Sequence, residues 1–446
     1  ICFSFSELLG NELFELAEQP DRKKIEKKEE KKKTRSYWKK NNLLFHRFMR
    51  ASEYSGQNPS FLGIKKPYYN GRFDLVPIGI HFTNQTLSPN FLFEYFSDGQ
   101  HLSDNDKSDV SSTLGNLHLL TQISANPIAF EYGPVGFDVK VNAMVNGKIK
   151  GNLLSLPFQD FVIGSTLEQN MDIEIFSYHQ FGLKYGHKFK TDMATFRAGI
   201  GLNFYQGHTF FKAEMDTMNF INSNDSVAVN YSYYLEGSQM IWSQMDDQSN
   251  VEMAETFSSS TQGFDIGFGV NLMKIIKQNV DIEFGLMNLG TTLTFDKAKK
   301  ERYSFSLTGE DLQNLGEVNE EDENEADTTL IYENKKLDIQ IPSNWFFQVT
   351  YQPMQQLIFS VAMEKGAEKR FFTEDTPRIT VRTGIYPFNW LNLNFGVKTI
   401  HGQIMQNVGF GIQSKYVDFL LNVSSYDGWQ YNSHGMGINL RTSFYF

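Results

Sequence analysis

The clearest evidence for the fold is the C-terminal stretch Gly435-Met-Gly-Ile-Asn-Leu-Arg-Thr-Ser-Phe-Tyr-Phe446. Its even-numbered positions carry mostly apolar side chains, whereas its odd-numbered positions carry Gly, Asn, Arg, Ser and Tyr. A period of two is the pattern of a β-strand whose two faces meet different surroundings. The same split recurs in six further segments, at residues 137–142, 196–204, 263–272, 280–286, 391–397 and 417–424. The whole pattern predicts about fourteen strands.

The composition of the polar faces decides between a soluble sandwich and a membrane barrel. Exposed faces of soluble sheets are usually rich in Lys, Glu and Thr, whereas these faces consist of Gly, Asn and Ser with single charges. Small polar residues suit the crowded inside of a closed barrel, and dense Phe, Leu, Ile and Val suit contact with lipid. No run approaches the roughly 20 apolar residues of a spanning helix. The sequence therefore predicts an all-β, transmembrane antiparallel barrel.

The connections between the expected strands differ in length. Short turns are expected near residues 277–278, 353–355, 387–389 and 414–415, and the longer connections between them include residues 295–343, 365–376 and 426–433. Outer-membrane barrels alternate short turns at one end with long loops at the other. Tyr386 and Trp390 flank one short turn, as residues of an interfacial aromatic belt would.

Charge and cysteine content exclude several classes of protein. The net charge is −11, and residues 21–40 concentrate Lys and Arg, so the remainder is more acidic still. This balance argues against a nucleic-acid partner. The single Cys2 excludes a disulfide framework and a zinc site built on cysteines. Residues 1–50 show neither the alternation nor the pattern of an intact secretory signal, so we expect a charged extension that is disordered or non-native.

Catalytic and metal-binding patterns are not found. The nine histidines form no His-Glu-x-x-His pair, and there is no Gly-x-Ser-x-Gly elbow or phosphate-binding glycine loop. The acidic stretch 317–327 lacks the spacing of a calcium loop and is expected to be a solvated outer loop. The sequence thus predicts no enzyme, no cofactor and no metal.

Four segments carry a resemblance to a known group: Ala51-Ser-Glu-Tyr-Ser-Gly-Gln-Asn-Pro-Ser-Phe-Leu-Gly63, the pair Gly263–Val270 and Val280–Gly290, Tyr303–Leu312, and Ile341-Pro-Ser-Asn-Trp345. In order and pattern, residues 51–446 resemble outer-membrane barrels of the long-chain fatty-acid transporter (FadL) type, and within them an uncharacterised family of Bacteroidetes and related bacteria. The resemblance implies a hatch at residues 51–67 inside the lumen of a barrel at residues 68–446. It also implies the bacterial outer membrane, its lipid as partner, and passage or binding of hydrophobic compounds such as a long-chain ligand. The alternative is a non-enzymatic scaffold barrel that anchors or presents surface or secretion components.

Two sets of residues are candidates for the site. Ten charged residues fall on the polar faces and are expected in the lumen, as a paired network or in contact with a ligand: Asp138, Lys140, Arg197, Asp265, Asp281, Glu283, Arg378, Arg382, Asp418 and Arg441. Six apolar residues at inward or hatch positions are expected either to form an oily resting pocket or to pack hatch against wall: Phe61, Leu62, Met287, Phe346, Ile358 and Leu420.

Overall fold

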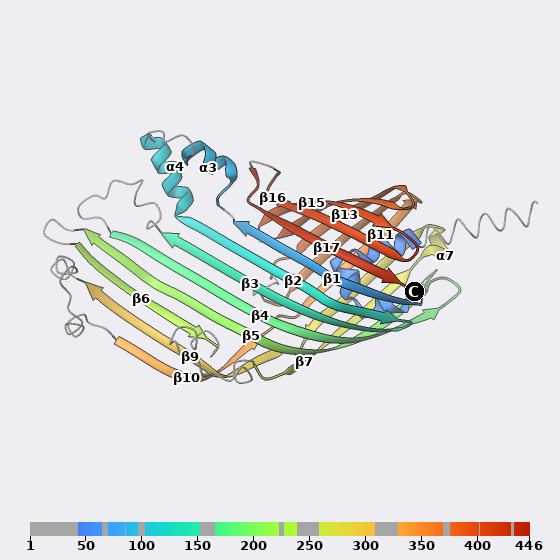
Figure 1. Ribbon diagram of the computed structural model, residues 1–446, viewed down its shortest axis with the longest axis horizontal. Coiled ribbons are helices and arrows are strands. Elements are labelled where there is room, and N and C mark those ends of the chain that lie inside the picture. Colours follow the sequence, from blue (N-terminus) through green and yellow to red (C-terminus); the bar gives the residue numbers. More distant parts are fainter. Residues whose placement is uncertain are drawn as a thin grey trace, which may run out of the picture.

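The computed structural model describes residues 43–64, 70–84, 86–96, 103–151, 166–222, 227–238, 258–307, 329–368, 375–400, 402–429 and 432–446. Strands dominate these residues and lie side by side in a curved wall (Figure 1). Along them, buried and more exposed side chains alternate. Among the described helices, none is long and apolar enough to cross a bilayer.

Fourteen antiparallel strands form a closed wall. Going around the wall, the strands are β1 (Gly71–Asn84), β2 (Asn116–Tyr132), β3 (Val135–Gly151), β4 (Thr166–Lys190), β5 (Thr195–Asn222), β7 (Thr261–Asn271), β8 (Asn279–Leu289), β11 (Asn344–Met354), β12 (Leu357–Gly366), β13 (Arg378–Phe388), β14 (Leu391–Ile400), β15 (Gln403–Gln413), β16 (Val417–Tyr426) and β17 (Gly435–Tyr445). The wall closes because β1 also pairs with β17, from Arg72 opposite Tyr445 to Thr83 opposite Gly435. The predicted number of strands and the all-β barrel are thereby confirmed.

Three further strands extend the wall on one side. They are β6 (Val227–Gly237), β9 (Thr292–Leu307) and β10 (Thr329–Gln340). The first part of β5 pairs with β7 and its last part with β6, after which β6 pairs with β9 and β9 with β10. Figure 1 shows this extension reaching well beyond the ends of β11–β17. The prediction that residues 295–343 form one outer connection is therefore wrong for the parts that belong to β9 and β10. The acidic stretch 317–327 lies outside the described residues.

The hairpin of β9 and β10 is ordered because it covers an apolar surface. Its inward side chains Leu293, Phe295 and Ile339 are buried in one cluster with Phe176 of β4 and Phe210 of β5. Burial of several large apolar side chains stabilises the hairpin by the hydrophobic effect. The outer part of the lumen wall is consequently apolar, in contrast to the polar wall deeper in the barrel.

The outer face of the barrel is apolar. On β5 the side chains of Phe196, Ile200 and Phe204 are 47%, 55% and 39% exposed, while the intervening Arg197 and Asn203 are buried inside. The same exposure pattern continues on the other wall strands. A closed barrel with such an outer surface is a transmembrane barrel, because only lipid can cover these side chains favourably.

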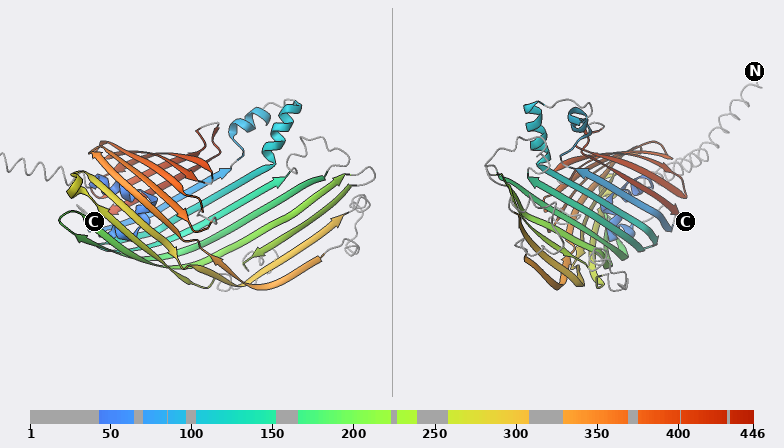
Figure 2. Two further views of the ribbon diagram at one scale, coloured as in Figure 1. Left: turned by 180° about the vertical axis from the view of Figure 1, so that it is seen from behind. Right: turned by 60° about the vertical axis from the view of Figure 1, so that its left-hand side comes forward.

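The two ends of the barrel differ as predicted. Short turns follow β7 with α7 (Met273–Ile276), β11, β13 and β15 at one end. At the other end, the helices α3 (Pro89–Phe96) and α4 (Asp104–Leu114) lie between β1 and β2 (Figure 2). Trp390 is exposed and stacks on Phe388 at the short-turn end. Tyr386, in contrast, is not a belt residue, since its side chain is buried inside the barrel.

A segment ahead of β1, residues 43–64, fills the lumen near the short-turn end and is called the plug below (Figure 1). It consists of a helix at residues 43–50, α2 (Glu53–Gln57) and the 3-10 helix η1 (Pro59–Gly63). The hatch implied by the resemblance is therefore present. However, residues 44–50, expected to belong to the extension, are buried in the lumen because their apolar side chains recur at helical spacing and face the wall. Residues 1–42 and 65–67 lie outside the described residues.

Glycines on the inner wall form the seat of η1. A Cβ atom at Gly186 would lie 2.5 Å from the Pro59 carbonyl oxygen, and one at Gly199 would collide with the backbone of Pro59 and Ser60. One at Gly267 would collide with the Asn58 side chain. Ser60 is completely buried at this seat. The small inner faces seen in the sequence are thus explained at these positions by the close approach of the plug backbone.

Candidate functional site

Ion pairs join the plug to the arc of the wall that runs from β14 to β2. Arg50 donates two hydrogen bonds to the Glu131 carboxylate of β2, and the Arg47 Nε atom lies 3.2 Å from Asp418 Oδ2 on β16. Lys398 of β14, two strands from β16, donates to Glu53 Oε1 at 2.5 Å. All these groups except the Glu53 carboxylate are nearly inaccessible to solvent. The plug is therefore held by buried charges that need one another, since an unpaired charge in such a place is costly.

Apolar contacts hold the plug between these ion pairs. Phe61 packs with Ile358 of β12 in one cluster that also contains Tyr386. Tyr54 packs against Phe346, at 5.5 Å between ring centroids, in a second cluster that includes Met287.

The six predicted apolar residues are thus distributed over several places. Phe61 with Ile358 and Met287 with Phe346 lie in two different plug-to-wall clusters. Leu62 packs over Gly136 of β3, and Leu420 lies in the wall of a larger cavity. The structure does not bring all six into one oily pocket.

The ten predicted charges all lie inside the barrel. Arg197 of β5 binds Asp281 of β8 through two hydrogen bonds of 2.6 and 2.7 Å, and it approaches Glu283 at 3.4 Å. Asp138 accepts from Lys184 at 2.6 Å, and Asp265 accepts from Asn203 at 2.7 Å.

The remaining charges lie against the plug or the open lumen. Arg378 pairs with Glu364 at 2.7 Å, and Asp418 with Arg47 of the plug. Lys140, Arg382 and Arg441 line the cavity. Most of the ten are therefore structural pairs, and the last three remain available to a solute.

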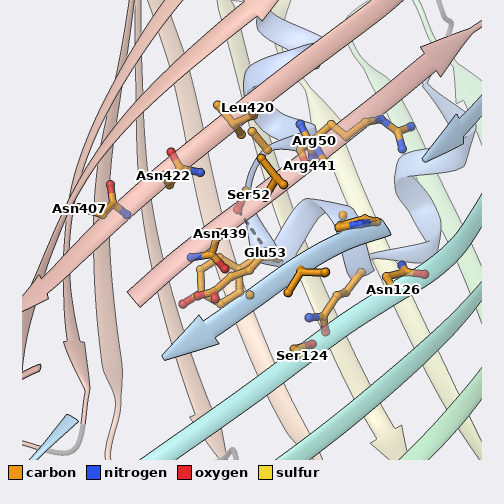
Figure 3. A pocket seen from close by; sticks show the side chains of 18 of the residues that line it. Arg50, Ser52, Glu53, Ser124, Asn126, Asn407, Leu420, Asn422, Asn439 and Arg441 are labelled. Carbon is orange, nitrogen blue, oxygen red and sulfur yellow. Dashed lines mark hydrogen bonds between the residues drawn. The ribbon is translucent and has the colours of Figure 1, made fainter. Parts of the chain in front are cut away.

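The main cavity lies between the plug and the wall and measures about 340 Å³ (Figure 3). Residues 50–57 of the plug form its floor, and β1–β3 and β13–β17 form its sides. A second cavity of about 330 Å³ adjoins it and shares the lining residues Glu53, Tyr54, His81 and Lys398. Together they make the open part of the lumen, on the side of the plug that faces away from the short-turn end.

The wall of the main cavity carries a row of amides. Asn394, Asn407, Asn422 and Asn439 come from β14, β15, β16 and β17, one from each of four successive strands. Asn407, Asn422 and Asn439 lie along the same side of the cavity in Figure 3. Asn422 and Asn439 are direct cross-strand partners.

Lys398 of the wall determines the charge state of Glu53 in the cavity floor. Burial would raise the pKa of Glu53, but the neighbouring Lys398 ammonium outweighs this and lowers the pKa to about 2. Burial raises the pKa of Tyr54 well above its ordinary value, and its hydroxyl lies 3.0 Å from the Thr380 hydroxyl. Glu53 is therefore a carboxylate and Tyr54 a neutral phenol at neutral pH.

The sequence analysis missed two parts of this site. Arg47 and Arg50 were placed in the extension, although the apolar residues around them, Leu44, Phe45 and Phe48, have the spacing of an amphipathic helix. The amides were recognised as inward positions, but their gathering into one wall depends on strand register. Within the described residues, no group of three or more His, Cys, Asp or Glu is arranged to hold a metal ion.

Fold and lumen together define a plugged transmembrane β-barrel. The chain belongs to a family of unknown function (DUF5723), which matches residues 66–425. No curated protein matches the chain.

Among solved structures, the chain is similar to three proteins over most of its length. They are the Ralstonia pickettii toluene transporter TbuX (TM-score 0.40, 10% identity, covering 88% of this chain and 93% of that one), the Pseudomonas putida toluene transporter TodX (0.38, 9%, 87% and 92%), and a Pseudomonas aeruginosa FadL homologue (0.36, 10%, 88% and 93%). Barrels of the long-chain fatty-acid transporter type, the group that the sequence resembles, are thus among the matches.

Proposed function

We propose that this protein is a barrel of the bacterial outer membrane that binds small molecules in its lumen and lets them pass when the plug moves. The observation that carries the proposal is the pair of adjoining cavities above a plug that is a separate segment of chain. The lipid-facing outer surface and the two unlike ends of the wall support the outer-membrane location.

The plug is the element that must move. Residues 43–64 lie across the lumen without entering the wall, so they can shift without breaking a cross-strand pair. Their contacts with the wall are side-chain ion pairs and small apolar clusters. Such contacts can be exchanged for contacts with a solute or a partner at modest cost, whereas the strand ladder cannot.

The chemistry of the solute is constrained by the cavity. The resemblance implies hydrophobic compounds, but a purely apolar solute in the main cavity would leave buried amide and charged groups unpaired. Passage of a hydrophobic compound would need a route along other residues, such as the apolar outer part of the lumen wall.

The scaffold alternative is favoured by one observation. The plug is tied to the neighbouring wall strands β16 to β2 by buried pairs, Arg50 with Glu131 and Arg47 with Asp418, as a permanently closed lumen would require. A barrel of this kind would act through its outer surface and its outer connections, not through its lumen.

A reversible lock on the plug tests the proposal. Ser52 Oγ lies 2.7 Å from Gln348 Oε1, and this oxygen lies two bonds beyond the position of a cysteine sulfur. In a Cys2→Ser background, oxidation in the presence of ethanedithiol should therefore join Ser52→Cys to Gln348→Cys through a short bridge of two disulfides between plug and wall. The matched control is Asn279→Cys with Gln352→Cys, which joins β8 to β11 and leaves the plug free. Ion current through planar bilayers should fall on oxidation and return on reduction in the first variant only. A current that oxidation leaves unchanged in both variants, or no current in any state, would favour the scaffold.

A further inference from the structure

The amide wall of the main cavity is built around glycines. Asn394 on β14 lies opposite Gly409, and Gly409 in turn lies opposite Asn422 on β16. A Cβ atom at Gly409 would collide with the Asn422 side-chain oxygen. Similarly, Asn407 lies opposite Gly396, where a Cβ atom would lie 2.8 Å from its amide oxygen. The glycines therefore leave room for the amides to lie along the wall and face the lumen.

Polar atoms of this wall lack partners. Asn394 is only 3% exposed, and neither its amide oxygen nor its amide nitrogen has a hydrogen-bond partner among the described residues. Ser424, which also lines the cavity, is 1% exposed, and its hydroxyl has no hydrogen-bond partner among the described residues either. Leaving such groups unsatisfied destabilises the protein. Amide and hydroxyl groups with unused donors and acceptors therefore belong to residues of the cavity lining.

The charge of the cavity is opposite to that of the chain. Although the net charge is −11, six cationic residues and three carboxylates line the main cavity. Three of the cations, Arg50, Arg72 and Lys398, are paired with carboxylates. Lys140, Arg382 and Arg441 form no ion pair with any carboxylate of the described residues. With the three paired cations, these three account for all six Lys and Arg residues of the cavity lining.

Two of these cations lie beside the amides and contact the plug, Arg382 on the strand next to β14 and Arg441 on the same strand as Asn439. Arg382 comes from β13, and its guanidinium lies over the ring of Phe48 at 5.0 Å from the centroid. Arg441 comes from β17 and donates from Nη1 to the Arg50 carbonyl oxygen at 3.0 Å. Figure 3 shows Arg441 beside Arg50, with Asn422 and Asn439 on the same side of the cavity. Each guanidinium is positioned by one contact and keeps further donors for a ligand.

We propose that this wall is a binding site for a small anion that also carries several hydroxyl groups, such as a sugar acid or a sugar phosphate. Guanidinium groups bind carboxylates and phosphates with two parallel hydrogen bonds. Amides present a donor and an acceptor together, which suits hydroxyl groups. A cavity of about 340 Å³ is within the range of small-molecule sites.

The site is coupled to the plug. An anion that draws Arg441 and Arg382 toward itself competes with their contacts to Arg50 and Phe48 of the plug. Binding at the wall therefore weakens the seating of the plug at the same time. This inference rests on the proposed function, because it names the class of solute that the lumen admits.

Binding measurements on the full-length protein in detergent test the inference. The probes are gluconate and glucose 6-phosphate, with glucose, inorganic phosphate and laurate as comparisons, all measured by titration calorimetry. We expect gluconate and glucose 6-phosphate to bind, and glucose and inorganic phosphate to bind at least tenfold more weakly. Inorganic phosphate binding as tightly as the two polyhydroxylated anions would overturn the inference, and so would laurate binding in their place.

Variants locate the site. Arg441→Gln and Asn394→Leu should each weaken gluconate binding at least tenfold, whereas Arg441→Lys should retain part of it. The matched control Lys148→Gln removes a cation from an exposed pair with Asp172, outside the cavity, and should change nothing. Because Asn394→Leu could disturb the wall, Asn422→Leu on the neighbouring part of the wall is a second test of the amides. Unchanged binding in Arg441→Gln and in both leucine variants would place the anion elsewhere and overturn the inference.

The outcome also separates the inference from the proposed function. If the plug lock controls ion current but no polyhydroxylated anion binds, the inference fails and the proposed function stands. If neither binding nor lock-dependent current is found, both fail.

Discussion

The Arg50 guanidinium of the plug and the Glu131 carboxylate of β2 form a two-point ion pair, with Nη2 lying 2.5 Å from Oε2. Glu131 also lies 3.5 Å from Arg72 of β1, which itself binds Asp74. One carboxylate of the wall therefore serves both the plug and the neighbouring strand. Its loss affects the position of the plug before it affects the strand ladder, because β1 and β2 remain paired through their backbones.

Glu131→Gln should release this side of the plug. The variant removes the Glu131 carboxylate from the buried Arg50 guanidinium, and breaking such a buried pair typically costs about 3–5 kcal/mol. We expect a larger and more frequent ion current through planar bilayers, because the plug leaves its seat more often. Asp172→Asn breaks an exposed pair with Lys148 and serves as the control, with no expected change in current. An unchanged current in Glu131→Gln would mean that the other contacts suffice to hold the plug.

Gly199→Ala should displace η1 from the wall. The added methyl group would occupy the space of the Pro59 and Ser60 backbone, which has no rotamer by which to avoid it. Ser60, completely buried in the wild type, should therefore become accessible. The measurement is maleimide labelling of Ser60→Cys in a Cys2→Ser background, with and without Gly199→Ala.

Gly147→Ala is the control for this experiment. A Cβ atom at Gly147 would meet only the Ile173 side chain, at 4.0 Å, so labelling of Ser60→Cys should stay slow. Equal labelling in the two glycine variants would contradict the role assigned to the glycine seat.

The barrel could be predicted from the sequence because lipid and lumen impose a period of two on every wall strand. The segment 435–446 shows this in isolation, and β17 has the predicted faces, with Ile438 exposed and Ser443 buried. The number of strands followed from the number of such segments. The same rule placed Lys140 and Arg382 on the inner face, where the cavity lies.

What each inward residue contacts could not be predicted in the same way. Tyr386 lies beside a turn, where a residue of the interfacial aromatic belt is expected, but its side chain packs inside the barrel in one cluster with apolar residues of the plug. The hairpin of β9 and β10 is ordered by its contact with β4 and β5, which are distant in sequence. The amide wall exists only because the register of four strands aligns Asn394 and Asn422 across Gly409. Register and plug position are properties of the closed barrel, and a local pattern does not contain them.

Ile438→Arg should destabilise the barrel through its outer face. Ile438 is exposed to the surroundings of the barrel, is the fourth residue of β17, and lies opposite Ile80 and Val423. An arginine facing lipid near the bilayer midplane costs roughly 2–4 kcal/mol, and much less near the interfaces. Tyr416→Arg, at an exposed short turn, is therefore the control and should cost less than about 1 kcal/mol. Urea-induced unfolding in lipid vesicles measures both, and equal stabilities would argue against the lipid-facing assignment of Ile438.

Acid should remove the contribution of Glu53 to stability over a defined pH window. The pKa of Glu53 is lowered from 4.5 to about 2, because the Lys398 ammonium outweighs the effect of burial. A lowered pKa in the folded state stabilises the protein above the ordinary pKa, and this contribution is lost as the pH falls from about 4.5 towards 2. The measurement compares thermal unfolding of the wild type and Glu53→Gln at several pH values. We expect the wild type to be more stable at pH 7, with the difference shrinking below pH 4.5 and vanishing near pH 2. Other carboxylates titrate in both proteins, so the difference isolates Glu53. A difference that does not depend on pH would show that the pair with Lys398 contributes nothing through charge.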